Sequence, residues 1–284
     1  MQIIDTYPEI IEILNRMSGR FDMALWEQYA NGISKELPGL LKKDYADNNQ
    51  DDQNRIITVL NAVITERDKL EITHHSFSQA IGNDLDKRIY AVCGADLHVT
   101  IMLYLGLCNG AGWATTLDGI PAVLLGIEKI AELNWHGADD MRALIYHELG
   151  HIWHEQFGKM HQKTPTMRDK YILQLYQEGI AGYFEQLLYG DLNKYHQDKN
   201  GWLDWCKENK SELNHEYLRR LAQNESAHVF FGDWQNYQGW GDVGYFIGCE
   251  FVKSLASKYS LTELANLDIS VIYNEFTAYS QKTQ

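Results

Sequence analysis

Apolar residues recur at helical spacing through the first part of the chain. Isoleucine and leucine occupy positions 10, 11, 13 and 14, and a second apolar series occupies positions 56, 57, 60 and 63. A period of three to four residues predicts amphipathic helices. The polar stretch DYADNNQDDQN between the two series predicts a solvated loop or the start of a helix. We therefore expect residues 1–88 to form a helical N-terminal region.

The pattern changes between residues 89 and 135. IYAVCGADLHVTIMLYLGLC and PAVLLGIEKI are short runs rich in residues that favour β-strands, and the Gly-rich segment NGAGWATTLDG separates them. They predict one small sheet, antiparallel or mixed, and no other segment predicts strands as clearly. PAVLLGIEKI could form the edge of a cleft and pair with an extended peptide, or it could be part of a buried hairpin.

Helical periodicity returns at Gly137. A helix is expected from Ala138, where acidic residues suit the positive end of the helix dipole, to near Gly158. A second helix is expected from about Thr166 to Gly190. Further helical segments are expected at 202–221, 244–259 and 261–276, around the aromatic-rich loop FFGDWQNYQGWGDVGY. The fold class is therefore α+β, mostly helical with a small sheet.

Composition narrows the classes of function. The chain has 284 residues and a formal net charge of −14, which repels nucleic-acid phosphates and anionic membrane surfaces. The N-terminus lacks the features of a signal peptide and no apolar run is long enough to cross a membrane, so a cytoplasmic protein is expected. The four cysteines, at positions 93, 108, 206 and 249, have no CxxC spacing and are expected to be free buried thiols.

The segment YHELGHIWHEQ carries the candidate chemistry. His147 and His151 are four residues apart in an expected helix, so both imidazoles project from one face and can share one zinc ion. Glu148 can then reach a water molecule activated by the metal. The opposite face is apolar, which supports a helix here. His154 is rotated away from the pair and is expected on the surface or behind the ligands.

A catalytic zinc site needs a third protein ligand. Glu178, in LYQEGIAGYFEQ, is the candidate, because an antiparallel pairing of the two expected helices would bring its carboxylate to the histidines. Gly179 and Gly182 would permit close helix packing. Solvation of Glu178 on a helix surface is the alternative, but its apolar neighbours indicate a largely buried helix, where an unpaired carboxylate is costly.

HELGH followed by QEGIAGYFE resembles the gluzincin signature, which the aminopeptidase-N-like enzymes share. NGAGWATT, HELGH, EGIAGYF and GYFIGCEFV together resemble a bacterial family of predicted zinc-dependent proteases, over residues 90 to 275. The resemblance implies a zincin-like fold and a catalytic domain at 89–284. The chain departs from the aminopeptidases because NGAGWATTLDG has no glutamate to hold a free N-terminus, so strict aminopeptidase activity is not expected.

The resemblance also implies a transition-state donor from the C-terminal part. Tyr245 is the first candidate, with His228 and Tyr237 as alternatives if Tyr245 instead packs in the core beside Phe246 and Phe251. The adjacent His74 and His75 are expected to be structural or exposed to solvent.

The expected function is zinc-dependent hydrolysis of peptide bonds, with His147, His151 and Glu178 as ligands and Glu148 as general base. A peptide or protein substrate is the expected partner, and nucleic acid and membrane are not. The alternative is a non-catalytic regulatory or binding protein on a zincin scaffold. The sequence does not indicate the oligomeric state.

Overall fold

The computed structural model describes residues 1–82, 84–232 and 234–282. The chain divides into two compact units, residues 1–90 with 95–148 and residues 91–94 with 149–284. Each unit is described by itself. No helix among the described residues is long and apolar enough to cross a lipid bilayer.

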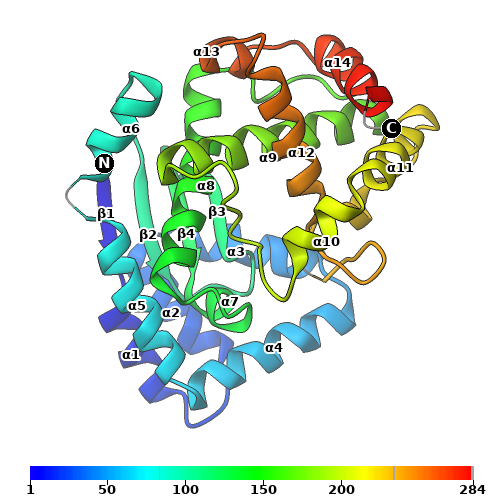
Figure 1. The fold of residues 1–284 in the computed structure, drawn as a ribbon. Coiled ribbons are helices and arrows are strands. Elements are labelled where there is room, and N and C mark those ends of the chain that lie inside the picture. The colour runs from blue at the N-terminus through cyan, green and yellow to red at the C-terminus, as the bar shows by residue number, and fades with distance from the viewer. Residues whose placement is uncertain (83, 233, 283–284) are drawn as a thin grey trace. The chain divides into compact units, whose positions relative to one another are not determined.

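The first unit contains a four-stranded sheet and most of the N-terminal helices (Figure 1). Its elements are β1 (Gln2–Asp5), α1 (Tyr7–Arg16), α2 (Met23–Ile33), α3 (Leu37–Asp47), α4 (Gln50–Thr65), α5 (Asp68–Ala80), α6 (Leu85–Cys93), β2 (Thr100–Tyr104), β3 (Gly112–Leu117), β4 (Ile120–Gly126), α7 (Ile127–Glu132) and α8 (Ala138–Phe157). Helices α6 and α8 are continuous across the division between the units.

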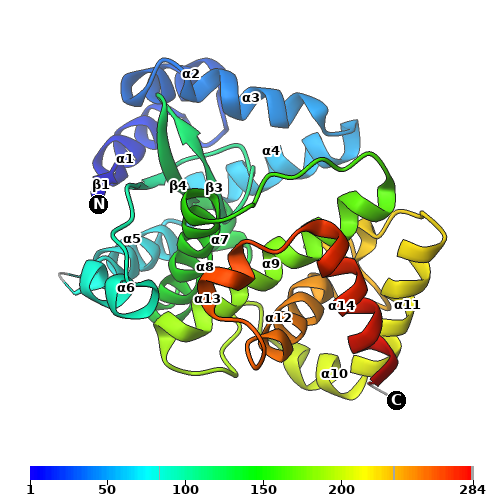
Figure 2. The ribbon, with the colours of Figure 1, turned by 90° about the horizontal axis from the view of Figure 1, so that it is seen from above.

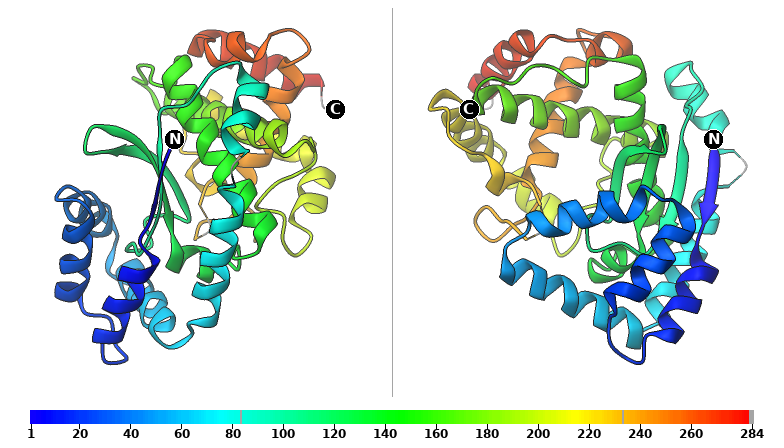
Figure 3. Two further views of the ribbon diagram at one scale, coloured as in Figure 1. Left: turned by 90° about the vertical axis from the view of Figure 1, so that its left-hand side faces the viewer. Right: turned by 180° about the vertical axis from the view of Figure 1, so that it is seen from behind.

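The sheet is mixed, with the strand order β1-β2-β4-β3. β1 runs parallel to β2 and β2 parallel to β4, whereas β3 and β4 form an antiparallel hairpin. β1 forms one edge (Figure 3), and β3, which pairs only with β4 among the described residues, forms the other. Asp118 and Gly119 have positive φ at the hairpin turn, and the Asp118 amide donates to the Glu36 carboxylate, just before α3.

Three expectations for this region are wrong. β1 lies in the region expected to be entirely helical. IYAVC belongs to helix α6, where only Ile89 of this run is buried and Tyr90 is exposed, and IEKI belongs to the buried helix α7. β4 is an interior strand and therefore not an edge, so the hairpin interpretation of PAVLLG is confirmed.

The second unit is helical (Figure 2). It contains α9 (Met167–Tyr189), α10 (Trp202–Glu208), α11 (Lys210–Ala222), α12 (Val243–Leu255), α13 (Leu261–Ala265) and α14 (Ile269–Lys282), with a 3-10 turn at His228–Phe230. The Thr166 hydroxyl caps the start of α9, and Gly190, at φ +81°, ends it. The predicted helices at 138–158 and 166–190 are therefore confirmed, whereas the segments at 202–221 and 261–276 are each two helices.

Helices α9 and α12 approach each other closely at glycines. A Cβ on Gly179 would overlap the backbone of Gly248, and a Cβ on Gly248 would overlap the carbonyl of Leu175. A Cβ on Gly182 would lie 3.3 Å from Cys249 Cβ of α12, which is slightly tighter than an ordinary contact. The glycines expected to allow close packing do so, and their partner is α12. Gly150 is the glycine of HELGH that lies against α9, 2.7 Å from Ala181 Cα when a Cβ is added.

The cysteines are free, as expected. Cys206 and Cys249 are buried, and burial raises the pKa of the Cys249 thiol to about 12, so this thiol is unreactive at neutral pH. Cys93 and Cys108 are half-buried rather than buried.

Candidate metal centre

Helix α8 presents the two histidines of the HExxH segment. The helix has no break between Ala138 and Phe157, so His147 and His151 lie one turn apart on one face. Leu144, Ile145, Leu149 and Ile152 are buried, which confirms the predicted apolar face. His147 is 3% exposed and His151 is 9% exposed. Imidazole nitrogens buried in this way need polar partners.

The third candidate ligand lies beside them. Glu178 Oε2 is 3.2 Å from His151 Nε2, and one ligand atom each from His147, His151 and Glu178 lie within 4.8 Å of one another. These three residues can therefore hold a metal ion. Two ligands about 2.05 Å from a tetrahedral zinc are separated by about 3.3 Å, so the distance between His151 Nε2 and Glu178 Oε2 suits this donor set.

A second group, missing from the sequence interpretation, also includes His147. Ligand atoms of His147, Glu185 and His196 lie within 4.8 Å of one another, and all three residues are buried. Glu185 Oε2 is 2.9 Å from His196 Nδ1, and Glu185 Oε1 accepts a hydrogen bond from the backbone amide of His196. Glu185 follows Glu178 by seven residues, two turns along the same face of α9, which is the one sequence signal that could have found it.

Glu148 belongs to the first unit and faces the start of β3. A Cβ on Gly112 would lie 2.5 Å from Glu148 Oε1 and 2.7 Å from its Cγ. The Glu148 side chain, in a residue 7% exposed, therefore fills the space that a larger residue at position 112 would need. Glycine at this position lets the carboxylate lie directly against the edge strand.

The loop that leads into β3 is held by a buried carboxylate. Glu128, in α7, accepts hydrogen bonds from the backbone amides of Gly106 and Cys108, at 2.9 and 3.0 Å. Burial raises the pKa of Glu128 to about 7, and the two amide bonds partly oppose this shift. A Cβ on Gly106 would lie 2.7 Å from Glu128 Oε1, so the loop depends on glycine here too.

His154 is buried, 1% exposed, so of the two positions expected for it, on the surface or behind the ligands, the surface one is wrong. It lies edge-on to Tyr176, with ring centroids 6.3 Å apart. Burial, followed by the nearby His151, lowers the pKa of His154 to about 4, so its ring is neutral at physiological pH.

The histidine pair at 74 and 75 lies apart from the metal centre. His74 stacks on Tyr7 and is 2.7 Å from Asp5 Oδ2, so it has a structural role, while His75 is exposed and contacts Gln79. The prediction of structural or solvent-facing positions is confirmed for both.

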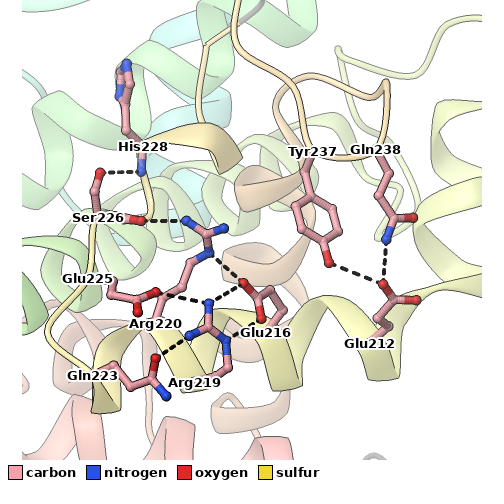
Figure 4. Close-up of polar contacts among 10 residues, drawn as sticks. All are labelled: Glu212, Glu216, Arg219, Arg220, Gln223, Glu225, Ser226, His228, Tyr237 and Gln238. Atoms are coloured by element: carbon pink, nitrogen blue, oxygen red, sulfur yellow. Dashed lines mark hydrogen bonds and ion pairs between the residues drawn. The ribbon is translucent and has the colours of Figure 1, made fainter.

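The three candidate donors from the C-terminal part lie in different surroundings. Tyr245 is half-buried and packs against Phe231 and His196, with ring centroids 6.0 and 6.4 Å apart. Tyr237 stacks on Phe230, and its hydroxyl donates to Glu212 (Figure 4). His228 is exposed and lines a pocket that includes Glu178.

Comparison with known proteins finds no relative of this chain. No protein-family model matches the chain, and neither a curated protein nor a solved structure matches it. The arrangement of side chains is therefore the basis for inferring function.

Proposed function

We propose that this protein is a zinc-dependent peptidase of the gluzincin type. His147, His151 and Glu178 hold the metal, and Glu148 is the general base. The observation that carries the proposal is the convergence of these two histidines and one glutamate within 4.8 Å, from α8 and α9. Two imidazoles and one carboxylate leave one position of a tetrahedral zinc ion for water or substrate.

The choice of Glu178 over Glu185 as third ligand rests on access. Glu178 lines an open pocket of about 510 Å³, so substrate can reach a metal beside it. Glu185 is 2% exposed, and both of its oxygens already bind His196. We assign the Glu185–His196 pair to positioning His147, as carboxylates commonly do behind metal-binding histidines.

The chemistry divides between the metal and the chain. A bound zinc ion would polarise the scissile carbonyl. It would also lower the pKa of water, so that a nucleophilic hydroxide is available at neutral pH. Glu148 takes the proton from the attacking water and delivers it to the leaving amine nitrogen. Tyr245 is the proposed donor to the oxyanion of the transition state. Hydrolysis then needs no covalent bond between substrate and protein.

Strand β3 supports a peptide as substrate. It pairs only with β4 among the described residues, so its other edge has backbone groups available to an added strand. Gly112, the first residue of β3, lies against Glu148. A peptide that pairs with β3 would therefore pass close to the general base, whereas a small ester would gain nothing from this edge.

The decisive experiment combines metal content with cleavage. Zinc per chain is measured by elemental analysis for the wild type and for His147→Ala, Glu148→Gln, Glu178→Gln, Glu185→Gln and Tyr245→Phe, and each is tested on a diverse peptide library. We expect about one zinc per chain, lost in His147→Ala and Glu178→Gln and retained in the other three. Cleavage should fall by about 10²–10⁴-fold in Glu148→Gln and by about 10²–10³-fold in Tyr245→Phe.

The other outcomes have definite meanings. Absence of zinc from the wild type contradicts the proposal. If Glu185→Gln loses zinc and Glu178→Gln retains it, the metal is instead held by His147, Glu185 and His196. Zinc without cleavage of any peptide favours a non-catalytic binding protein on the same scaffold. Tyr237→Phe is the matched control for Tyr245→Phe, because its hydroxyl is bound to Glu212.

A further inference from the structure

The pocket that contains Glu178 has a distinct chemical character. It lies entirely in the second unit, between one face of α9, the 160–164 segment and His228. Glu178 is the one carboxylate among its described lining residues. In the proposed function this carboxylate is a zinc ligand, so the remaining lining is neutral or cationic. This is unusual on a chain with a formal net charge of −14.

Two cationic or cation-forming side chains in the pocket are available to a ligand. Among the described residues, no carboxylate lies within ion-pairing distance of Lys170, whose ammonium lies over the Tyr171 ring, 5.4 Å from its centroid. The neighbouring Asp169 instead pairs with Arg168. His228 is exposed, and its ring has no hydrogen bond to another described residue. Both can therefore bind an anion without first breaking an ion pair.

His228 is held in place by its backbone rather than by its ring. Its amide donates to Ser226 Oγ, at 3.2 Å, and the same hydroxyl is hydrogen-bonded to Tyr171, at 2.7 Å. Arg220 fixes this turn from the other side, because it donates to the Ser226 carbonyl and to Glu216. In Figure 4 the His228 ring points away from this network. These hydrogen bonds therefore fix the backbone of His228 and do not involve its ring nitrogens, which can bind a ligand.

The spacing on α9 gives the distance from the metal centre. Lys170, Gln174 and Glu178 follow one another at four-residue intervals on one face of the helix, so each step rises by about 6 Å and Lys170 is about 12 Å along the axis from Glu178. An extended peptide covers that distance in about three to four residues. Gln174, between them, can hydrogen-bond a peptide group on the way.

We propose that this pocket binds a carboxylate of the substrate, about three to four residues from the cleaved bond. This inference rests on the proposed function, because it takes Glu178 as the metal ligand next to which cleavage occurs. The carboxylate can be an acidic side chain or the C-terminus of a short peptide. Lys170 and His228 donate charge-assisted hydrogen bonds to this carboxylate.

The test is direct binding of four labelled hexapeptides to zinc-loaded Glu148→Gln protein, measured by fluorescence anisotropy. The peptides combine Glu or Gln near one end with a free or an amidated C-terminus. In the same background, Lys170→Gln and His228→Gln are compared with Lys194→Gln. Lys194 is a matched control, because its ammonium also lies over a tyrosine ring, Tyr189, and it lies outside the pocket.

We expect at least one carboxylate-bearing peptide to bind about 10-fold more tightly than the uncharged peptide, and Lys170→Gln to remove this preference. Lys194→Gln should keep it. Preference for Glu identifies an acidic side chain, and preference for the free terminus identifies a C-terminal carboxylate.

Equal binding of all four peptides, or an unchanged preference in Lys170→Gln, would overturn the inference. Because binding is measured without turnover, this result is separable from failure of the proposed function. Cleavage without a preference for the carboxylate would contradict only the pocket assignment. A preference for the carboxylate without any cleavage would contradict the peptidase proposal and, with it, the stated distance from a cleaved bond, and would leave only a carboxylate-binding pocket.

Discussion

At the scale of single residues, the position of the Glu148 side chain depends on the absence of a side chain at Gly112. Gly112 has no side chain, and Glu148 occupies the space where a Cβ would stand. Gly112→Ala should therefore displace the Glu148 carboxylate by a fraction of an ångström or more. We expect peptide cleavage to fall by about 10²-fold, since misplacing a catalytic group by about 1 Å has an effect of this size.

Metal content is the control in this experiment, because Gly112→Ala changes no proposed zinc ligand and should retain about one zinc per chain. Gly39→Ala is the matched variant, since an added Cβ there meets no atom within 4 Å and should leave cleavage unchanged. Full activity of Gly112→Ala would show that Glu148 does not need its present position.

The site was predictable from sequence where its residues share a helical repeat. His147, His151 and Glu148 come from one short segment, and Glu178 comes from one long apolar helix with clear ends. His196 was not predictable, because it lies in an irregular segment and contacts Glu185 only through the folded chain. The burial of His154 depends on packing against Tyr176, which no local pattern encodes.

At the scale of elements, the close contact between α9 and α12 predicts that an added side chain at Gly179 lowers the stability of the protein. Gly179→Ala should force the two helices apart or distort them, because the new Cβ would overlap the Gly248 backbone. Overpacking of this kind costs about 1–3 kcal/mol. Gly182→Ala, one turn along the same helix, would place its Cβ 3.3 Å from Cys249 Cβ, and the gain in helix propensity offsets that contact.

Thermal unfolding of the two variants tests this difference. The melting temperature should fall by several degrees in Gly179→Ala and stay near the wild-type value in Gly182→Ala. Equal melting temperatures would mean that α9 and α12 are not in contact through Gly179.

The long helices were predictable because their ends carry local signals, such as the Thr166 cap and Gly190 beyond the last turn. β1 was not, because four residues are too few to show a period and their pairing partner lies almost 100 residues away. IYAVC and IEKI were misassigned for another reason. Short apolar runs fit a buried strand and a helix stripe equally well, and tertiary packing decides between them.

At the scale of the whole molecule, metal removal should weaken the protein without unfolding it. Each unit has its own buried apolar core, so no fold depends on the metal alone. Dialysis against a chelator should lower the melting temperature, by an amount equivalent to about 3 kcal/mol if zinc was present at 100 times its dissociation constant. The far-ultraviolet circular dichroism spectrum should remain helical at 25 °C.

Re-addition of zinc should restore both melting temperature and cleavage, and the Glu178→Gln variant should not respond to the chelator at all. Unfolding on chelation would instead identify a closed structural site, in which the metal's binding free energy is part of the folding free energy.

One edge of β3 pairs with no other strand that the structure describes, and this affects the handling of the protein. An unpaired strand accepts any extended segment, and a second copy of the same strand is the most abundant one in a concentrated solution. β3 has only six residues and carries no charged side chain that would repel a copy of itself. A peptide bound along this edge would therefore act as a solubilising agent, and preparations without one would be the first to self-associate on concentration.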